Sequence, residues 1–280
     1  MSTCYVVATP IGNIEDWSPR AIETLKTVDL IFAEDTRHSA KLMQLFNITT
    51  PMRSLHDHNE IDRIDEISNL LNDGQSIAII SDAGTPLISD PGFKVVRALR
   101  EQEQIIIPIP GVSALITALS VSGIATDRFS FEGFLPAKSS GRKSKMDALK
   151  KDPRTLIFYE SSHRIIEMLK DAISVFGADR YAFIGREMTK HYESYLSNTL
   201  EELLTYYQAH SDEQRGEYVV VIEGCPATTT EPTDGIDLQE LLEVLLAELP
   251  LKQAVSIAMK ITKLSKNHIY QTALTIQNNV

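Results

Sequence analysis

The sequence predicts an α/β protein with two domains of this class followed by a small helical module. Short apolar runs rich in β-branched residues alternate with amphipathic segments of helical spacing in the first part of the chain. A second alternation of this kind follows, and a linker rich in threonine and proline then precedes three short helical segments. We therefore expect domains at residues 1–120 and 121–225 and a helical module at residues 236–280.

The first domain is expected to contain a largely parallel sheet, because its strands are almost entirely apolar and helices separate them. The expected strands span residues 4–8, 29–33, 76–81 and 105–109. The expected helices span residues 19–27, 37–46, 59–71 and 93–102. Trp17, the only tryptophan, is expected to pack against the start of the helix at Pro19 rather than to stack on a base.

The second domain is expected to begin near residues 121–128. Its expected strands span residues 129–133, 155–160, 181–185 and 218–223, with helices at residues 163–175 and 199–210. The terminal module is expected to consist of helices at residues 238–249, 251–263 and 266–276. Pro250 separates the first two, and Ser265 is a suitable N-cap for the third. These helices resemble a helix-turn-helix module, and a helical cap that packs on the rest of the protein is the alternative.

The charge distribution bears on the class of partner. The net charge of −11 argues against a nucleic-acid partner, but residues 137–154 hold seven lysines and arginines against two aspartates. Residues 249–280 hold four lysines and no acidic residue. An acidic protein can still bind a polyanion at such local basic patches, and a plain solvated face is the alternative.

Membrane and metal sites are not expected. The N-terminus carries no basic leader and no apolar run approaches the length of a membrane span, so we expect a cytoplasmic protein. The two cysteines, Cys4 and Cys225, are far apart and lack the spacing of zinc ligands. The segment His56-Asp57-His58 is interpreted as a polar loop before a helix and not as a set of metal ligands.

The stretch ISDAGTPLISDPG, residues 80–92, places two glycines, two prolines and two aspartates directly after an apolar strand. In open α/β sheets, ligands bind beyond the carboxyl ends of the strands, where this stretch begins. Gly84 permits a positive φ angle and close approach of a ligand to the backbone, while Pro86 and Pro91 stiffen the loop. The sequence therefore predicts a ligand-binding loop here.

Loops of similar composition follow the other three strands of the first domain. They are ATPIGN at residues 8–13, EDTR at residues 34–37 and PGVSA at residues 110–114. One such loop alone would be an ordinary turn, but four loops at one edge of a sheet indicate a binding site. The sequence has no G-x-G-x-x-G after the first strand and no G-K-[ST], which disfavours a Rossmann dinucleotide site and a P-loop.

These motifs occur together with GFLPAK (residues 133–138), FYESSHR (158–164), REMTK (186–190) and GEYVVVIEG (216–224). In this order they resemble the tetrapyrrole-methylase superfamily of S-adenosylmethionine-dependent methyltransferases. Within it, the resemblance is to the members that methylate the ribose 2'-oxygen of a cytidine in the decoding centre of 16S rRNA. SDAGTPLISDPG is the most specific motif, whereas Ser162 and Met188 stand where proline and leucine are common in the family.

The resemblance implies two α/β domains with S-adenosylmethionine in the cleft between them, a homodimer, and 16S rRNA or the small ribosomal subunit as partner. The implied cofactor residues are Pro10, Asp82, Ala83, Gly84, Thr85, Ile88, Ser113, Ala114, Tyr159 and Met188. RNA contacts are expected at the lip of this cleft, in a Gly- and Ser-rich segment that we expect to be flexible. The expected contacts are Lys138, Arg142, Lys143 and Lys145, with Arg37 in addition.

The sequence does not identify the catalytic base. Carboxylates at the expected edge of the cleft are Glu34, Asp35, Asp90 and Glu187, and capping of a loop or pairing with a neighbouring arginine is the alternative for each. Asp35 is the first candidate, because it ends a strand beside the expected cofactor.

Two other functions share part of this pattern. A tetrapyrrole methyltransferase would have the same fold and cofactor, but a small porphyrinogen does not require the basic segment or the charged tail. A non-catalytic RNA-binding scaffold would keep the fold without the cofactor, and the intact loop around Gly84 argues against it.

Overall fold

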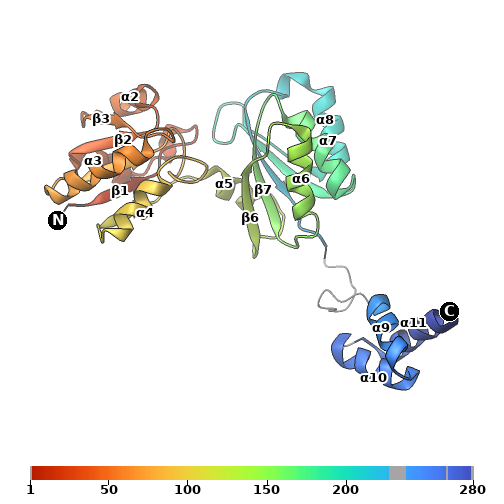
Figure 1. Cartoon of the computed structure of the whole chain (residues 1–280). Coiled ribbons are helices and arrows are strands. Elements are labelled where there is room, and N and C mark those ends of the chain that lie inside the picture. Colours follow the sequence, from red (N-terminus) through yellow and green to blue (C-terminus); the bar gives the residue numbers. More distant parts are fainter. Residues whose placement is uncertain (1, 227–237, 263, 279–280) are drawn as a thin grey trace. The chain divides into compact units, whose positions relative to one another are not determined.

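The computed structural model describes residues 2–226, 238–262 and 264–278, and the chain divides into two folded parts after residue 225 (Figure 1). Residues 1–225 contain two β-sheets with their helices, and the described part of residues 226–280 consists of three helices. This confirms the predicted α/β class with a C-terminal helical module. Within the described residues, no helix is both long enough and apolar enough to span a bilayer.

The first sheet is parallel throughout, with the strand order β3-β2-β4-β1-β5. Its strands are β1 (Cys4–Val7), β2 (Leu30–Ala33), β3 (Met52–Ser54), β4 (Ile77–Ile80) and β5 (Ile106–Ile109). The helices in this part of the chain are α1 (Pro19–Thr27), α2 (Thr36–Leu45), α3 (Glu60–Asn72), α4 (Phe93–Glu101) and α5 (Ala114–Val121). Because all five strands are parallel, their carboxyl ends share one edge of the sheet, where the motif loops begin.

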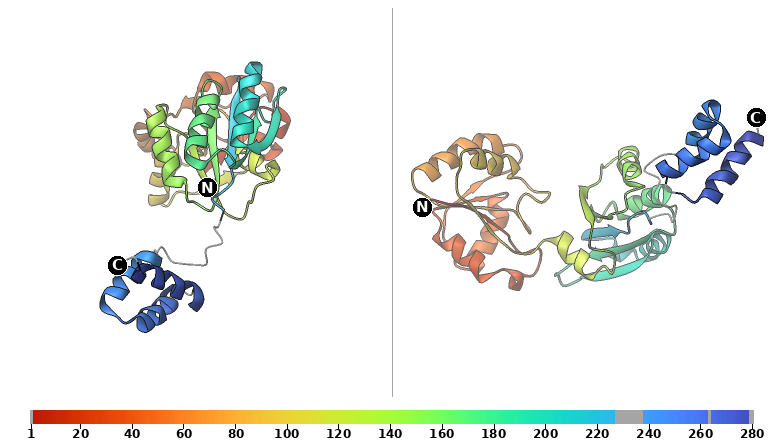
Figure 2. Two further views of the ribbon diagram at one scale, coloured as in Figure 1. Left: turned by 90° about the vertical axis from the view of Figure 1, so that its right-hand side faces the viewer. Right: turned by 90° about the horizontal axis from the view of Figure 1, so that it is seen from below.

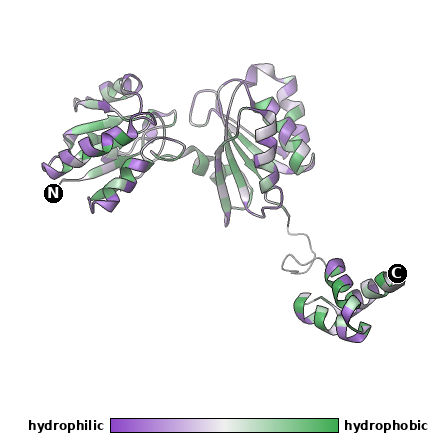
Figure 3. Ribbon diagram, viewed as in Figure 1, coloured by the Kyte–Doolittle hydropathy of each residue, from purple (hydrophilic) through white to green (hydrophobic). Residues whose placement is uncertain are grey.

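Helices cover both faces of this sheet (Figure 2). Successive residues of a strand point to opposite faces, so on β4 Ala78 and Ile80 pack with α1 and α2, whereas Ile77 and Ile79 pack with α3 and α4. Burial on both faces explains why β2 and β4 are hydrophobic along their whole length (Figure 3). Trp17 packs in the first of these clusters beside the start of α1, as predicted.

The second sheet is mixed, with the order β6-β7-β10-β8-β9 and only β6 and β7 parallel. Its strands are β6 (Phe129–Phe134), β7 (Thr155–Ser161), β8 (Tyr181–Arg186), β9 (Ser194–Thr199) and β10 (Glu217–Ile222). The helices α6 (Ser139–Leu149), α7 (Ile165–Phe176) and α8 (Leu200–Ala209) pack on one face, and α5 packs on the other.

Among the described residues, two short 3-10 helices, Ile14–Asp16 and Ser211–Glu213, lie outside the sequence-based prediction, as do β3, α5, α6 and β9. The other elements are confirmed to within two residues at each end. β3 and β9 are polar strands at the edges of their sheets, so they lack the apolar run that identifies a buried strand. α5 is apolar on nearly all sides and shows no amphipathic period. α6 forms in the segment that the sequence predicts to be flexible, although Ser139, Ser140 and Gly141 begin it.

In its described part, the helical module consists of α9 (Leu238–Glu248), α10 (Leu251–Thr262) and α11 (Lys266–Asn278). Its buried core is formed by Leu242, Val255, Ala258, Ile269 and Ala273. Pro250 lies between α9 and α10 as predicted. The hydroxyl of Ser265 accepts a hydrogen bond from the His268 N–H, so Ser265 caps α11 as predicted. Residues 236–237, 263 and 279–280, which the prediction includes, lie outside the described residues.

Arg142 is buried, which corrects its assignment as an RNA contact. The residue is 3% exposed, and its Nε donates to the carboxylate of Asp171 on α7 at 2.7 Å. Its Nη1 donates to the carbonyl oxygen of Ala137 at 3.2 Å. Because all of its described partners belong to the second sheet's own helices and loops, Arg142 holds the loop before α6 onto α7.

We expect Arg142→Ala to destabilise the protein strongly, because the buried carboxylate of Asp171 would lose its closest partner. Removing one member of a buried ion pair typically lowers the free energy of unfolding by about 3–5 kcal/mol. The control Lys150→Ala, at the exposed end of α6, should change that free energy by no more than about 0.5 kcal/mol. Urea unfolding followed by circular dichroism measures both, and equal midpoints for the two variants would contradict the structural role of Arg142.

Candidate active site

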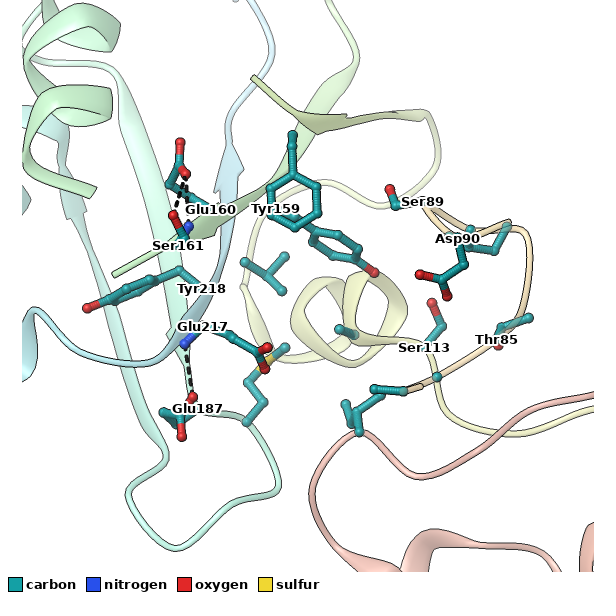
Figure 4. Close-up of a pocket in the computed structure, with 18 of the residues that line it drawn as sticks. Thr85, Ser89, Asp90, Ser113, Tyr159, Glu160, Ser161, Glu187, Glu217 and Tyr218 are labelled. Carbon is teal, nitrogen blue, oxygen red and sulfur yellow. Dashed lines mark hydrogen bonds between the residues drawn. The ribbon is translucent and has the colours of Figure 1, made fainter. Parts of the chain in front are cut away.

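A pocket of about 270 Å³ is enclosed by loops and strands of both sheets within residues 1–225 (Figure 4). The loops after β1 and β4 and the start of α5 form one wall, and β7, β10 and the loop after β8 form the other. Of the implied cofactor residues, those that line the pocket are Ala83, Gly84, Thr85, Ile88, Ser113, Ala114, Tyr159 and Met188. The other lining residues are Ile11, Ser89, Asp90, Phe134, Glu160, Ser161, Glu187, Lys190, Glu217, Tyr218 and Val219.

Two implied cofactor residues, Pro10 and Asp82, do not line this pocket. Pro10 is buried. The carboxylate of Asp82 accepts a hydrogen bond from the Asp35 N–H at 3.1 Å, and the Asp82 N–H donates to the carboxylate of Glu34 at 3.3 Å. Asp82 therefore joins the loop after β4 to the loop after β2 and supports the pocket wall from outside.

Gly84 adopts a backbone conformation that other residues rarely adopt. Its φ angle is +85°, and a Cβ built there would lie 3.2 Å from the side chain of Ile11. The Gly84 N–H donates to the carbonyl of Thr9 at 3.1 Å, and the Thr9 N–H donates to the carbonyl of Gly84 at 2.9 Å. The loop after β4 thus lies tightly against the loop after β1, in a place where only glycine fits without strain.

Both walls of the pocket also contain residues other than glycine with positive φ angles. Leu87 (φ +73°) and Ser89 (φ +69°) lie in the loop after β4, and Glu187 (φ +48°) and Thr189 (φ +65°) lie in the loop after β8. Each such residue costs about 1–3 kcal/mol, and such residues are concentrated at binding and active sites. The surrounding contacts therefore hold both walls in conformations that the isolated segments would avoid.

Direct hydrogen bonds join the two walls. The Asn13 N–H donates to the hydroxyl of Thr189 at 3.1 Å, and the Leu115 N–H donates to the hydroxyl of Tyr159 at 3.1 Å. A Cβ on Gly12 would lie 2.5 Å from the side chain of Lys190, so the loop after β1 approaches the loop after β8 very closely.

Asp90, Ser113 and Tyr159 converge on one side of the pocket. Their carboxylate and hydroxyl groups point toward one another, although they come from the loop after β4, the start of α5 and β7 (Figure 4). Burial raises the pKa of the Tyr159 hydroxyl, and the negative charge of Asp90 adds to this shift. These three side chains therefore form a polar group at the edge of a mostly apolar wall.

Asp90 is the carboxylate in the pocket whose titration is moved to neutral pH. Burial raises its pKa to about 7, repulsion by Glu34 adds to the shift, and a hydrogen bond with Ser81 opposes it. Asp82 and Asp57 contribute further repulsion. A carboxylate that exchanges its proton near the working pH is suited to general acid–base catalysis.

Asp35, the first candidate for a base from the sequence, has a different role in the structure. It is the N-cap of α2, and it does not line the pocket. Its carboxylate accepts hydrogen bonds from the guanidinium and the backbone N–H of Arg37 at 2.9 and 2.8 Å, and these lower its pKa to about 2. Because a carboxylate with so low a pKa is a poor proton acceptor, the structure corrects this assignment.

The other two candidate bases are also engaged. Burial raises the pKa of Glu34, but Glu34 is absent from the pocket lining. Glu187 lines the pocket, and its carboxylate pairs with Lys190 at 3.0 Å. Burial opposes the shift, but hydrogen bonds from the Glu217 N–H and from Lys190 lower the pKa of Glu187. Asp90 is therefore the candidate that the geometry favours.

The pocket carries more acidic than basic side chains. Asp90, Glu160, Glu187 and Glu217 line it together with a single base, Lys190. Lys190 itself pairs with Glu187 at 3.0 Å and with Glu217 at 2.6 Å. Such a pocket suits a small molecule with a positively charged group and disfavours a phosphate.

The remaining expected RNA contacts differ in the exposure of their side chains and in the partners that these side chains already have. The side chain of Arg37 is 90% exposed, although it pairs with Asp35. Lys138 is exposed, and the side chain of Lys143 is 47% exposed with its Nζ 3.5 Å from Asp171. Lys145 donates to the carbonyl oxygen of Glu132 and pairs with its carboxylate at 3.7 Å, so it is the least free of the four.

The segment His56-Asp57-His58 forms a loop before α3. The His56 N–H donates to the side-chain oxygen of Asn59 at 2.9 Å, as in a turn that leads into a helix. In the described ranges, no three His, Cys, Asp or Glu side chains are grouped so as to hold a metal ion.

Several lining residues have no role in the sequence-based prediction, notably Glu160, Glu217 and Val219. They belong to the motifs FYESSHR and GEYVVVIEG, which are far apart in the chain. Antiparallel pairing of β7 with β10 places Val219 opposite Tyr159 and so brings the motifs together. The sequence indicates that these motifs matter, because they belong to the family pattern. Only the register of β7 and β10 shows which residues of the motifs reach the pocket.

Two family profiles match the chain. The profile described as Tetrapyrrole (Corrin/Porphyrin) Methylases matches residues 3–204, and the profile described as RsmI C-terminal HTH domain matches residues 232–277. Among solved structures, the chain resembles diphthine synthase with a TM-score of 0.61 at 13% identity, over 80% of this chain and 90% of that chain. It resembles the methyltransferase CobJ with a TM-score of 0.60 at 14% identity, over 80% of this chain and 95% of that chain. At these identities the likeness shows the fold alone.

Among curated proteins, relatives named Ribosomal RNA small subunit methyltransferase I match almost the whole chain. The protein of Pseudomonas aeruginosa is 49% identical over 98% of both chains. The protein of Escherichia coli O157:H7 is 46% identical over 98% of this chain and 95% of its own, and that of Synechocystis is 44% identical over 99% of both. The chain therefore belongs to the tetrapyrrole methylase family and, within it, to the group of the ribosomal RNA small subunit methyltransferase I proteins.

Proposed function

We propose that the protein transfers a methyl group from S-adenosylmethionine to the ribose 2'-oxygen of a cytidine in the decoding centre of 16S rRNA. The observation that carries this proposal is the pocket in which Asp90, at the end of the loop that contains Gly84, converges with Ser113 and Tyr159. The name of the relatives supports small-subunit rRNA as the substrate. We include in the proposal that the protein acts in the cytoplasm as a homodimer, as the family resemblance implies.

The residues of the pocket fit S-adenosylmethionine. The backbone at Gly84 and the apolar side chains of Ile11, Ile88 and Met188 suit an adenosine, and the acidic side chains suit a sulfonium and an ammonium group. When bound, S-adenosylmethionine supplies an electrophilic methyl group.

Asp90 is placed to take the proton that the ribose hydroxyl loses during methyl transfer. With a pKa of about 7, its carboxylate is present in both protonation states near neutral pH. The hydroxyls of Ser113 and Tyr159 beside it limit the directions from which a substrate hydroxyl reaches the carboxylate. The two strained walls hold these groups in position before the substrate arrives, which is the main contribution expected of the protein in such a transfer.

Mass-spectrometric mapping of small-subunit rRNA tests the proposal. Small subunits incubated with the protein and S-adenosylmethionine should gain one 2'-O-methylcytidine that is absent when the protein is omitted. Methylation of a porphyrinogen in place of rRNA would support the tetrapyrrole alternative. Failure to bind S-adenosylmethionine in calorimetry would support a non-catalytic scaffold.

We expect Gly84→Ala to weaken S-adenosylmethionine binding at least about tenfold, and Gly84→Val to abolish it, because a side chain forces the loop away from Ile11. Gly74→Ala is the matched control. Gly74 has nearly the same φ angle, +86°, but no atom lies within 4 Å of a Cβ built there. Both alanine variants should lose about 1 kcal/mol of stability from backbone strain, but only Gly84→Ala should lose affinity in calorimetry. Equal affinities for the two variants would show that the loop is not a binding loop.

We expect Asp90→Asn to lower the rate of methyl transfer by about 10²–10⁴-fold, the usual contribution of a general base. The wild-type rate should rise with pH through about pH 7, where Asp90 loses its proton, and this rise should disappear in the variant. Asp35→Asn should transfer methyl groups at nearly the wild-type rate, because asparagine also serves as an N-cap for α2. Single-turnover measurements over a pH range of about 5.5–8.5 decide between the two carboxylates, and wild-type activity of Asp90→Asn would exclude Asp90.

Although it should lower the rate of methyl transfer, Asp90→Asn should raise the stability of the folded protein. The folded-state pKa of Asp90 lies above the ordinary aspartate value of 3.8, so the wild-type protein loses stability as pH rises toward about 7. An asparagine side chain carries no charge at any of these pH values, so Asp90→Asn should unfold at a higher temperature than the wild type at a pH of about 8. The difference should shrink at a pH of about 5, where Asp90 is protonated in the folded state.

We expect the double change Lys138→Ser and Lys143→Ser to weaken RNA binding while leaving S-adenosylmethionine affinity unchanged. Each lost phosphate contact on single-stranded RNA should reduce the slope of log K against log salt by about 0.7. The control is Lys26→Ser with Arg97→Ser, which removes the same charge from α1 and α4. Filter binding at several salt concentrations measures the slopes, and identical slopes for both double variants would place the RNA elsewhere.

A further inference from the structure

A second hollow adjoins the pocket and is not used by the mechanism above. This groove, which we call the β8–β10 groove, is lined by Arg186, Glu187, His191, Tyr192, Glu193, Ser194, Asp212, Glu213, Arg215 and Gly216. Glu187 lines both the groove and the pocket, and Gly216 is the chain neighbour of the pocket residue Glu217. The groove and the pocket therefore meet at Glu187.

Arg186 fixes the two sides of the groove. It is 9% exposed; its Nε donates to the carbonyl of Arg215 at 2.8 Å, and its Nη1 donates to the carbonyl of Tyr192 at 3.1 Å. A Cβ on Gly216 would lie 2.5 Å from the side chain of Glu187, so the two sides are also tightly packed where the groove meets the pocket. The groove is consequently held in shape by the protein's own contacts, which reduces the entropy that binding must overcome.

The groove presents aromatic rings to solvent. Tyr192 is 69% exposed, and its ring lies edge-on to that of His191, with 4.7 Å between centroids and 80° between planes. Arg186 donates a hydrogen bond to the Tyr192 carbonyl, which fixes the backbone at this residue. The ring of Tyr192 itself is largely exposed to solvent. Exposed aromatic rings of this kind are the surfaces on which unpaired bases of RNA stack.

Two polar groups of the groove residues are buried and find no hydrogen-bond partner within the described part of the chain. They are the hydroxyl of Ser194 and Oε2 of Glu213, whose other oxygen accepts from the hydroxyl of Tyr206. A buried polar atom without a partner is costly, and a rotation of either side chain toward a bound molecule would offset that cost. The pair offers one acceptor and one group that both donates and accepts.

The charges of the groove disfavour a phosphate as its occupant. The groove is lined by two arginines, Arg186 and Arg215, and by four acidic residues, Glu187, Glu193, Asp212 and Glu213. Arg186 already donates hydrogen bonds to two carbonyl groups. A flat, uncharged group with an amino donor and a carbonyl acceptor matches the open ring, the free carboxylate oxygen and the hydroxyl. Carboxylates accept hydrogen bonds from the exocyclic amino group of cytosine in known nucleic-acid complexes.

We propose that the β8–β10 groove binds an unpaired nucleobase of the substrate RNA, next to the nucleotide whose ribose enters the pocket. This inference rests on the proposed function. Tyr192 provides the stacking surface, and Glu213 and Ser194 provide hydrogen bonds to the edge of the base. The groove thereby holds the strand in register with the pocket, while the phosphates lie outside it.

The test compares RNA binding by the full-length wild type and Tyr192→Ala, with Tyr181→Ala as the matched control. Tyr181 is 39% exposed at the start of β8 and lies outside the groove. The first probe is a fluorescent single-stranded RNA with the small-subunit sequence around the acceptor, and the second has abasic nucleotides on either side of the acceptor. Loss of one stacked base should weaken binding of the first probe at least about fivefold in Tyr192→Ala. Tyr181→Ala should bind as the wild type does.

With the abasic probe, wild type and Tyr192→Ala should bind equally, and S-adenosylmethionine affinity should be equal in all three proteins. Tyr192→Trp adds a direct signal, because its fluorescence should be quenched by the first probe and not by the abasic one. If Tyr192→Ala binds the first probe as tightly as the wild type, or loses affinity equally for both probes, the groove does not bind a base. If the wild type binds the base-containing probe through Tyr192 but transfers no methyl group to small subunits, the proposed function fails while the groove assignment stands.

Discussion

The backbone pair between Thr9 and Gly84 is the constraint on which the pocket depends. β1 and β4 are parallel neighbours, yet the bridge between Thr9 and Gly84, just beyond their ends, is antiparallel. The chain after β4 must therefore reverse its direction within a few residues, and the positive φ angle of Gly84 makes that reversal possible. The other side of the loop after β1 is held by Trp17, whose indole N–H donates to the carbonyl of Ala8 at 2.9 Å. Neither loop can move without breaking contacts in the core of the first sheet.

This reversal determines where Asp90 lies and why its titration is unusual. The loop continues through Leu87 and Ser89, both with positive φ angles, and then brings Asp90 under cover near Glu34. The folded protein thus carries backbone strain and a partly buried carboxylate close to other acids. Both features reduce stability, and both are typical of binding and active sites. The parallel sheet with helices on both faces supplies the stability that allows this arrangement.

The sequence was sufficient for the features that depend on local patterns. The apolar strands of the first sheet, the helices between them and the loop at Gly84 all follow from periodicity and from the chemistry of glycine and proline. The choice between Asp35 and Asp90 could not be made in this way, because both follow the end of a strand. Asp35 lies two residues before Arg37, whose guanidinium pairs with its carboxylate. The acids that raise the pKa of Asp90 are Glu34 after β2, Asp82 in its own loop, and Asp57 before α3, and two of them are distant in sequence. Arg142 was misassigned for the same reason, since its partner Asp171 is on the next helix.

The distribution of charge connects the pocket to the proposed RNA substrate. Acidic residues predominate in both the pocket and the β8–β10 groove, so an RNA phosphate that entered either would meet repulsion at short range. The exposed Lys138 and Lys143 lie instead on the segment that follows β6, whose last residue, Phe134, lines the pocket. A strand held by its phosphates on such lysines would present only ribose and base to the acidic hollows. On this arrangement, the acidic interior prevents the backbone from entering too far and so limits which atom of the nucleotide reaches Asp90.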